Sequence, residues 1–330
     1  MQALPNSFQI KATCDQLIVV NSKDQIPSTF NSLGSHYLIL GGGSNILPID
    51  QFEGTVVQNK IFGITIVEED VDSIVIEVGA GMNWHELVMT CVDQNWGGLE
   101  NLALIPGTVG AAPMQNIGAY GVEAKDCIQT VHYYHISTQE FQSISNAEAN
   151  FGYRTSIFKT QLKNDCLITS VVFKLSKNHH QLHLSYGSIG EVLQKKNISN
   201  PTIRDVAEAV IEIRQSKLPD PAKIGNAGSF FKNPIISKSQ AETLHKNFPE
   251  VSIFDVDSQV SKVSAASLIE GCGWKGKIIG NTGTYKFHSL VLVNHGNATG
   301  AEIIQLSTDI QLSVFGKYGV KIEPEVNIVE

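Results

Sequence analysis

One segment of the chain restricts its possible folds more than any other: LENLALIPGTVGAAPMQNIGAYG, residues 99–121. It contains a single charged side chain, Glu100, and glycines punctuate it at 107, 110, 118 and 121. Such a segment is too uncharged for an exposed loop and too rich in glycine for a helix. A buried loop must also find partners for its backbone polar groups. We therefore favour a backbone wrapped around a flat, partly apolar ligand over a buried connecting loop.

A second glycine cluster, GGGSN at 41–45, follows an apolar run at 37–40 that predicts a strand. Three glycines let the backbone approach a ligand closely, and consecutive N–H groups can bind an anion. The cluster is no Rossmann fingerprint, because Ile46 stands where the third glycine of GxGxxG belongs and no helical pattern follows. It is no Walker loop either, since GK[ST] is missing. A structural turn and a phosphate cradle both stay open at this point.

Strand and helix patterns occur in separate groups along the chain. Alternating or apolar runs predict further strands at 54–60, 63–69, 73–81, 130–137, 165–175 and 319–330. Helical spacing predicts helices over 83–96, 202–218, 239–247, 263–271 and 301–315. Capping boxes pair Ser239 with Glu242 and Thr299 with Glu302. Without regular alternation of strands and helices, this pattern predicts the α+β class.

Bulk properties narrow the possible functions. A chain of 330 residues suggests two or three domains, and a net charge of −8 gives no broad basic surface for nucleic acid, so an anionic ligand needs local cations. Five scattered cysteines without a CxxC pair predict reduced, buried thiols and no metal site. No leader pattern or transmembrane-length apolar run occurs, so we expect a cytoplasmic protein without membrane partners.

Several charged residues occur next to neighbours that suggest either a structural or a binding role. Arg154 lies among apolar neighbours and needs an anionic partner, which a structural ion pair would also supply. Arg214 and Lys217 lie one turn apart just before Pro219 stops a helix, where a basic last turn is common in any case. Glu323 and Glu325 alternate along the predicted last strand, as on an ordinary solvated face.

The segment GNAGSFFKNP, residues 225–234, has no helix or strand period. A turn would explain its glycines. It does not readily explain Ser229 between Gly228 and Phe230, with Asn233 just after. Ser229 is either loop filler or a hydroxyl presented to a buried substrate.

Taken in this order, GGGSN, the 99–121 segment, FGYRTSIFK, KLPDP, GNAGSFFKNP and PEV resemble the UDP-N-acetylenolpyruvoylglucosamine reductases of bacterial peptidoglycan precursor synthesis. The resemblance runs from about residue 6 to the C-terminus. It implies an FAD-binding fold of the vanillyl-alcohol-oxidase/PCMH type with two subdomains, plus a C-terminal α+β substrate domain. The implied borders are 1–65 with 320–330, then 66–213, and then 214–319.

The resemblance also implies roles for individual residues. The implied catalytic residues are Arg154, Ser229 and Glu325. The implied FAD contacts are Gly41, Gly42, Gly43, Ser44, Asn45, Ile105, Pro106, Gly107, Gly110, Asn116, Gly118, Ala119, Tyr120, Gly121 and Tyr153. The implied substrate contacts are Arg214, Lys217, Asn233, His288 and, on the closing loop of the longer family type, Tyr186 in LSYGSIG.

In that family NADPH reduces FAD, and the enolpyruvyl ether of UDP-N-acetylglucosamine then takes hydride from flavin N5. The resemblance implies that Arg154 binds the substrate carboxylate, that Ser229 protonates the carbanion, and that Glu325 helps as a neutral acid. We expect a monomer acting on small molecules. The chain departs from the family at Gln9, where glycine is usual, at His288, where another polar residue is common, and at Asn327, where many relatives have arginine.

Two alternatives stay open beside this function. The first is an oxidase of the vanillyl-alcohol-oxidase type that uses O₂; many such enzymes attach flavin through a histidine, and the segments 41–45 and 99–121 contain none. The second is a UDP-sugar binding protein without activity, which the joint presence of Arg154, Ser229 and Glu325 disfavours.

Overall fold

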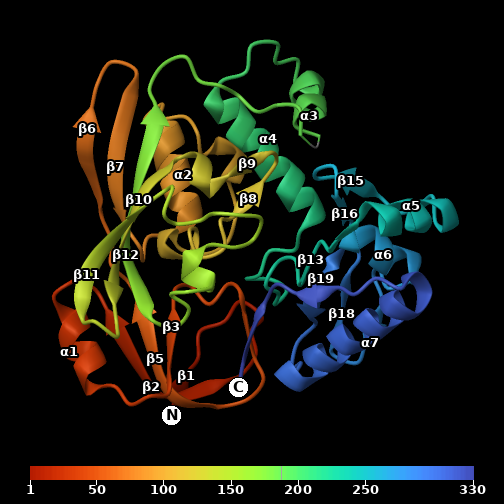
Figure 1. The fold of residues 1–330 in the computed structure, drawn as a ribbon, viewed down its shortest axis with the longest axis horizontal. Helices are drawn as coiled ribbons and strands as arrows, with labels where there is room; N and C mark the ends of the chain where they lie inside the picture. The colour runs from red at the N-terminus through yellow and green to blue at the C-terminus, as the bar shows by residue number, and fades with distance from the viewer. Residues whose placement is uncertain (187) are drawn as a thin grey trace.

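The computed structural model describes residues 1–186 and 188–330 of the chain. Figure 1 shows the two termini at the same end of the molecule, with the residues after helix α4 forming a separate lobe that contains α5, α6 and α7. Sheets and helices are grouped rather than interleaved along most of the chain. The predicted α+β class is therefore confirmed.

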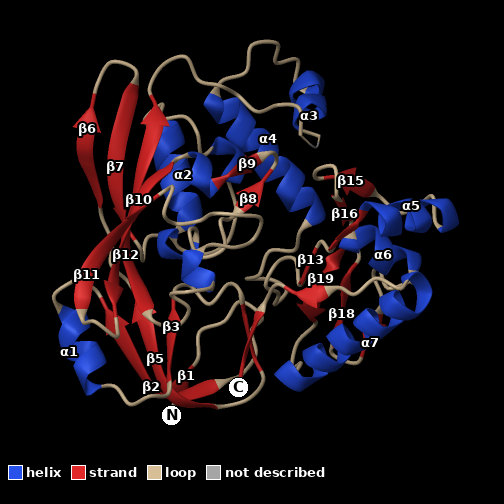
Figure 2. Ribbon diagram, viewed as in Figure 1, coloured by secondary structure: helices blue, strands red, loops and turns tan. Residues whose placement is uncertain are grey.

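The largest sheet has five strands, all antiparallel, in the order β11-β10-β12-β7-β6. Its strands are β6 (Ile64–Glu69), β7 (Ser73–Gly79), β10 (Ile128–His135), β11 (Glu140–Ser145) and β12 (Cys166–Ser176). Helices gather on one side of this sheet (Figure 2). Four of the five strands are predicted to within about two residues, because the alternating patterns mark them clearly.

The first sheet of the chain has a mixed topology, with parallel and antiparallel strands. Its order is β1-β2-β5-β3, and β5 (Phe52–Asn59) pairs in parallel with both β2 (Thr13–Val20) and β3 (Tyr37–Leu40). Helix α1 (Gln25–Ser32) connects β2 to β3, while β1 (Gln2–Ala3) pairs antiparallel with β2. Neither α1 nor β2 is predicted from the sequence, since α1 is short and rich in Pro, Ser, Thr and Asn.

Two helices that pack against each other lie on the same side of the five-stranded sheet (Figure 2). Helix α2 (Trp84–Asp93) begins where the Asn83 side chain accepts from the Glu86 N–H, and its apolar stripe is buried. Helix α4 (Ile203–Lys217) has a capping box of Thr202 and Asp205 and ends before Pro219, as predicted. Its apolar face is buried at Ile203, Ala207, Val210 and Ile213. A shorter helix, α3 (Ile189–Lys195), precedes α4.

The C-terminal lobe contains α5 (Lys238–Asn247), α6 (Ala265–Gly271) and α7 (Gly300–Tyr318). Its small antiparallel sheets are formed by β14 (Ile235–Ser237), β15 (Ile253–Asp255) and β16 (Val260–Val263), and by β17 (Ile278–Ile279), β18 (Thr282–Tyr285) and β19 (His288–Asn294). The predicted capping box at Thr299 is confirmed. The one at Ser239 is wrong, because Ser237 caps α5 with Gln240 two residues earlier.

The predicted C-terminal strand is broken at the residue of greatest interest. Strand β20 (Glu323–Pro324) pairs with β13 (Phe231–Lys232), whereas β21 (Asn327–Val329) pairs in parallel with β4 (Ile46–Pro48). Glu325 lies where the chain crosses from one partner to the other. Glu323 and Glu325 do not share a solvated face: 66% of the Glu323 side chain is exposed, but only 10% of the Glu325 side chain.

The buried hydrophobic residues form separate clusters, and some of these join segments that are far apart in the sequence. One large cluster runs from Ile74 to Ile213. A second joins residues between Leu4 and Val56 to residues between Phe230 and Val329. A small third cluster, which includes Val57 and Tyr134, links the first sheet to the five-stranded one. The N-terminal sheet is thus held between the other two parts of the molecule.

Two bulk predictions can be compared with the structure. All five cysteines are free, and four are buried; Cys272 is half-buried, so the expectation of buried thiols is wrong there. Burial raises the pKa of Cys91, Cys127 and Cys166 to about 12, which makes these thiols unreactive at neutral pH. Among the described residues, none of the helices combines the length and apolar character that crossing a bilayer requires.

Candidate active site

The glycine cluster 41–45 forms a loop between β3 and β4. Several backbone N–H groups of this loop make no hydrogen bond within the described residues. The N–H groups of Gly42, Gly43 and Ser44 have no acceptor among the described residues. The carbonyl of Gly43, in contrast, accepts from Ser7 N at 3.0 Å, which fixes the loop. Consecutive unpaired N–H groups of this kind suit a phosphate.

This loop forms one wall of a cavity of about 250 Å³. The 99–121 segment forms another wall, and the two predicted cofactor segments therefore come together. The cavity is lined from these segments by residues 41–45, Pro106, Thr108, Gly110, Ala111, Met114, Gln115 and Ile117. Lys159 is the one charged side chain, and no histidine is found, among the described residues that line it. The other lining side chains are apolar or carry amide or hydroxyl groups, which fits a flat ligand with a polar edge.

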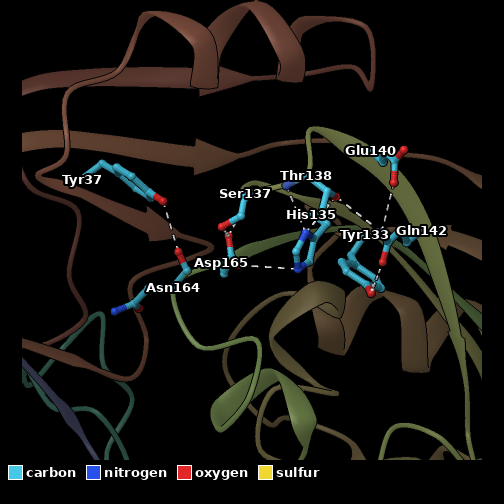
Figure 3. Close-up of polar contacts among 9 residues, drawn as sticks. All are labelled: Tyr37, Tyr133, His135, Ser137, Thr138, Glu140, Gln142, Asn164 and Asp165. Atoms are coloured by element: carbon cyan, nitrogen blue, oxygen red, sulfur yellow. Dashed lines mark hydrogen bonds and ion pairs between the residues drawn. The ribbon is translucent and has the colours of Figure 1, made fainter.

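A network of polar contacts holds a third wall, the loop that carries Asn164 (Figure 3). The Tyr37 hydroxyl donates to the Asn164 carbonyl at 3.1 Å, which links β3 to this loop. The adjacent Asp165 carboxylate accepts from the Ser137 N–H at 2.9 Å and lies 3.5 Å from His135 Nε2. Both sheets thereby hold the cavity in shape.

The remaining predicted cofactor residues lie just outside this cavity and shape its surroundings. Tyr120 and Gly121 are the two central residues of a tight hairpin between β8 (Gly118–Ala119) and β9 (Val122–Glu123). Both have positive φ, +51° and +82°, as the preferred two-residue hairpin turns require. The buried Asn116 side chain donates to Glu123 at 2.8 Å and to the Gly152 carbonyl at 3.2 Å.

That last contact leads to the turn that presents Arg154. Gly152 and Thr155 bond to each other's backbones, so Tyr153 and Arg154 are the central residues of a two-residue turn. Arg154 has φ +55°, a conformation that costs a non-glycine residue about 1–2 kcal/mol. The conformation orients its guanidinium: Nε lies 3.1 Å from Glu325 Oε1, and one terminal NH donates to the Gly118 carbonyl at 3.3 Å.

Two residues that the sequence interpretation misses complete this cluster. Gln115 Nε2 donates to Glu325 Oε1 at 3.1 Å, and Lys159 Nζ donates to Gln115 Oε1 at 3.1 Å. Burial lowers the pKa of Lys159 below its ordinary value of 10.5, against the opposing charge of Glu325. A lysine at the end of a short 3₁₀ helix, Ile157–Lys159, gives no signal of this in the sequence.

Ser229 is brought to the same place by backbone pairing. It forms an isolated bridge with Val291 of β19, and the next residue, Phe230, accepts at its carbonyl from the Glu325 N–H at 2.7 Å. Gly228, with φ +71°, makes the turn before it. Ser229 and Glu325 thus come from neighbouring backbone segments, and Arg154 reaches Glu325 with its side chain, although the three are far apart in the sequence.

A second group of predicted residues, Arg214, Lys217 and His288, forms a cationic group near Arg154. Burial lowers the pKa of Arg214, and its Nε has no hydrogen-bond partner among the described residues. Burial likewise lowers the pKa of His288, helped by the charges of Lys217 and Arg214. A ligand with negative charge and several acceptors fits such a set of donors.

Tyr186 lies over the hairpin of the 99–121 segment. A side-chain carbon added to Gly121 would be 3.3 Å from the Tyr186 Cβ, and 59% of Tyr186 is exposed. Its neighbour Gly187, part of the predicted loop motif, lies outside the described residues. Tyr186 therefore stands beside the cavity wall and in reach of solvent.

Tyr153 and Asn233 lie at the edge of a larger cavity of about 830 Å³ in the C-terminal lobe, between α5 and the end of α7. The Lys262 ammonium lies 5.0 Å from the centre of the Tyr153 ring. Asn233 accepts from the Ala265 N–H at 2.9 Å, at the start of α6. Tyr153 does not line the smaller cavity, so its assignment to the cofactor stays a prediction.

Known proteins resemble this chain over nearly its whole length. The UDP-N-acetylenolpyruvoylglucosamine reductase from Flavobacterium johnsoniae is 48% identical to this chain, over 98% of this chain and 96% of the relative. The chain belongs to the UDP-N-acetylenolpyruvoylglucosamine reductase family. A relative of the same name from Bacteroides fragilis is 42% identical, over 98% of this chain and 97% of the relative.

Family models and a solved structure agree with this membership. Residues 220–329 match the model for the UDP-N-acetylenolpyruvoylglucosamine reductase C-terminal domain, and residues 15–139 match the FAD binding domain. The solved reductase from Thermus caldophilus has the same fold, with a TM-score of 0.67 at 23% identity, over 98% of this chain and 96% of that one. The predicted family, the FAD-binding fold and the C-terminal domain are confirmed.

Proposed function

We propose that this chain reduces the enolpyruvyl ether of UDP-N-acetylglucosamine to UDP-N-acetylmuramate with NADPH and FAD, as a step of peptidoglycan precursor synthesis. Family membership at 48% identity over 98% of the chain carries the proposal. The contact between Arg154 and Glu325, next to the segment that carries Ser229, supports it.

The cavity fits FAD in its chemistry. The unpaired N–H groups of the 41–45 loop would hold a phosphate, and the 99–121 wall would lie against the flat ring. When bound, FAD would take hydride from NADPH and deliver it to the terminal carbon of the enolpyruvyl group. The absence of histidine among the described lining residues weighs against an oxidase with histidyl-linked flavin.

Arg154 and Glu325 would manage the charge that develops on the substrate. Hydride transfer leaves negative charge on the carbon next to the substrate carboxylate, and a fixed donor set stabilises it best in a dry site. The Arg154 guanidinium would exchange its contact with Glu325 for a contact with that carboxylate. Glu325 would act as a neutral acid, because a carboxylate would repel the new anion while a neutral acid donates to it.

Ser229 would donate the proton that completes the reduction. A hydroxyl is a weak acid in water, but a carbanion is a strong base, so transfer needs only fixed geometry. The bridge to Val291 and the turn at Gly228 fix the backbone of Ser229. The buried rings of Phe230 and Phe231 follow directly and help to exclude water.

The cationic group of Arg214, Lys217 and His288 would hold the rest of the substrate. Arg214 and Lys217 would contact the diphosphate, and His288 and Asn233 would orient polar groups of the sugar nucleotide. Tyr186 would close over the substrate from the hairpin side, as expected for the longer family type. The charges here supply the local cations that a chain of net charge −8 needs for an anionic ligand.

The proposal includes the organisation of the whole protein. We keep the predicted division into 1–65 with 320–330, 66–213 and 214–319; the core cluster from Ile74 to Ile213 supports the middle unit. A monomer in the cytoplasm is part of the same proposal, because NADPH and nucleotide sugars are intracellular metabolites. Size-exclusion chromatography with light scattering checks the monomer.

A spectroscopic experiment tests the reaction. The purified protein is loaded with FAD, bleached with NADPH under nitrogen, and mixed with the enolpyruvyl sugar nucleotide. We expect fast recovery of the yellow absorbance and formation of UDP-N-acetylmuramate. Fast recovery in air without that substrate would favour an oxidase, and a protein that takes up no flavin would favour a UDP-sugar binding protein.

A further inference from the structure

A chain of three contacts connects the flavin cavity to Glu325. Lys159 Nζ donates to Gln115 Oε1, and Gln115 Nε2 donates to Glu325 Oε1, each at 3.1 Å. Arg154 Nε lies 3.1 Å from the same carboxylate oxygen. Lys159 and Gln115 both line the cavity. The chain is therefore part of the wall between cofactor and substrate.

Elementary donor chemistry gives this chain a direction. An ammonium group can only donate hydrogen bonds, so the amide oxygen of Gln115 must face Lys159 and its NH₂ must face Glu325. The facing oxygen, Oε1, then has to accept from Gln115, and the Arg154 Nε lies 3.1 Å from the same oxygen. A proton on Glu325 can therefore sit only on the other oxygen, Oε2.

We propose that Lys159 is a positioning residue that fixes the amide of Gln115 and so determines which oxygen of Glu325 carries its proton. The inference rests on the proposed function, in which Glu325 acts as a neutral acid. Without the ammonium group, the Gln115 amide is free to turn its oxygen toward Glu325. A proton on Glu325 Oε1 would then have an acceptor in the amide, and it would face away from the substrate.

Local structure supports a dedicated role for Lys159. The 3₁₀ helix Ile157–Lys159 starts at Ser156, whose hydroxyl donates to the Met114 carbonyl at 2.7 Å, next to Gln115. The backbone thus sets the distance between Lys159 and Gln115. Among the described residues, no carboxylate lies within ion-pair distance of Lys159 Nζ. A partly buried lysine kept beside a neutral amide is costly unless the amide contact is used.

The test compares Lys159→Met with Lys159→Arg in the FAD-loaded protein. Lys163→Met, an exposed lysine on the same loop, is the matched control. Three quantities are measured for each variant: FAD affinity from flavin fluorescence, the rate of bleaching by NADPH, and the rate of recolouring by the enolpyruvyl sugar nucleotide. Each is also measured for Gln115→Ala and for Gln115→Ala combined with Lys159→Met.

We expect Lys159→Met to slow recolouring roughly tenfold, the effect of losing one charge-assisted hydrogen bond, with FAD affinity and bleaching within about twofold of wild type. Lys159→Arg should restore most of the rate, because arginine also only donates. In the Gln115→Ala background, Lys159→Met should have no further effect.

Three results would overturn the inference: a Lys159→Met rate equal to that of Lys163→Met, an undiminished loss in the Gln115→Ala background, or a loss of FAD affinity that accounts for the rate. Failure of the proposed function is distinguishable, because it would appear in the wild-type protein as no recolouring by the substrate.

Discussion

The two sides of the candidate site are built in different ways. The cofactor side consists mainly of backbone and uncharged side chains: the 41–45 loop has N–H groups that are unpaired within the described residues, and the 99–121 segment lines the cavity. The substrate side depends on charged side chains, above all Arg154 beside Glu325. Ligand binding on the cofactor side therefore depends on backbone conformation, and on the substrate side it depends on the charges of side chains.

This difference predicts how each side responds to mutation. A change on the cofactor side acts through φ angles and close backbone contacts, and so it alters stability and flavin binding together. A change on the substrate side removes a donor or a charge while the fold stays intact, and so it alters one chemical step. The following predictions use this contrast.

The largest effect is expected for Ser229→Ala. The variant loses the proposed proton donor, and general acid catalysis contributes roughly 10²–10⁴-fold, so recolouring by the enolpyruvyl substrate should slow by that factor. Bleaching by NADPH should stay nearly unchanged, because that step needs no proton from Ser229. Stopped-flow absorbance under nitrogen measures both steps, and Ser229→Cys, which keeps a proton donor, is the comparison variant. Equal losses in both steps would make Ser229 structural and remove the contrast between the two sides.

Gly43→Ala should have the largest effect on the cofactor side. Gly43 has φ +69°, and an added Cβ would lie 2.2 Å from the Pro5 carbonyl oxygen. The positive φ alone costs about 1–2 kcal/mol for alanine, and the clash adds to it. Urea unfolding should show this loss in the free energy of unfolding, accompanied by weaker FAD binding.

Gly42→Ala is the matched control for that prediction. Its φ is not positive, and the nearest atom to an added Cβ is 3.8 Å away. We expect a change in unfolding free energy within about 0.5 kcal/mol, as for ordinary tolerated substitutions. If both alanine variants were equally stable, the loop would not be conformationally constrained.

The cofactor side was largely predictable from sequence because its signals are local. Glycines and missing charges within 99–121 predict a backbone wrapped around a ligand, and that segment lines the cavity. At 41–45 the same kind of signal left a structural turn and a phosphate cradle open, and only the resemblance favoured the cofactor. The five-stranded sheet was predictable for the same reason, since alternation within each strand is a local pattern.

The substrate side was predictable only through resemblance to a family. The sequence pattern suggests that Glu325 is one of two solvent-exposed glutamates. No nearby residue indicates that the last strand is interrupted there and pairs with different strands before and after it. Lys159 and Gln115 carry no signal, because their contact joins residues 44 positions apart. The parallel pairing of β5 was also hidden, although the strand itself is predicted at 54–60, since pairing partners are set by tertiary packing.

His288→Gln should have a smaller effect that depends on pH. Burial lowers the pKa of His288, so the imidazole is neutral at pH 7 and glutamine can replace it as a polar partner. Turnover at pH 7 should fall by less than about threefold, within the range of a lost neutral hydrogen bond.

The stability of the same variant should differ from wild type in acid. A depressed histidine pKa means that the unfolded chain binds the proton more tightly, so the folded wild type loses stability as pH falls below the unfolded value of 6.5. His288→Gln removes this loss. Thermal unfolding from pH 7.5 down to 5 should therefore show a shallower decline for the variant, and parallel declines would mean that His288 is not buried neutral.

The smallest effect is expected at Gln9, where the family usually has glycine. Gln9 has φ +57°, a conformation that glycine adopts freely, and this explains the family preference. Its side chain donates to the Pro221 carbonyl at 2.7 Å, which ties the N-terminal segment to the chain after α4. Gln9→Gly should change the unfolding free energy by less than about 0.5 kcal/mol, because relief of backbone strain offsets the lost hydrogen bond and the added chain entropy. Gln9→Ala keeps the strain and loses the bond, so urea unfolding should rank it about 1 kcal/mol below Gln9→Gly. The reverse order would mean that the chain entropy added by glycine outweighs the backbone strain at this position.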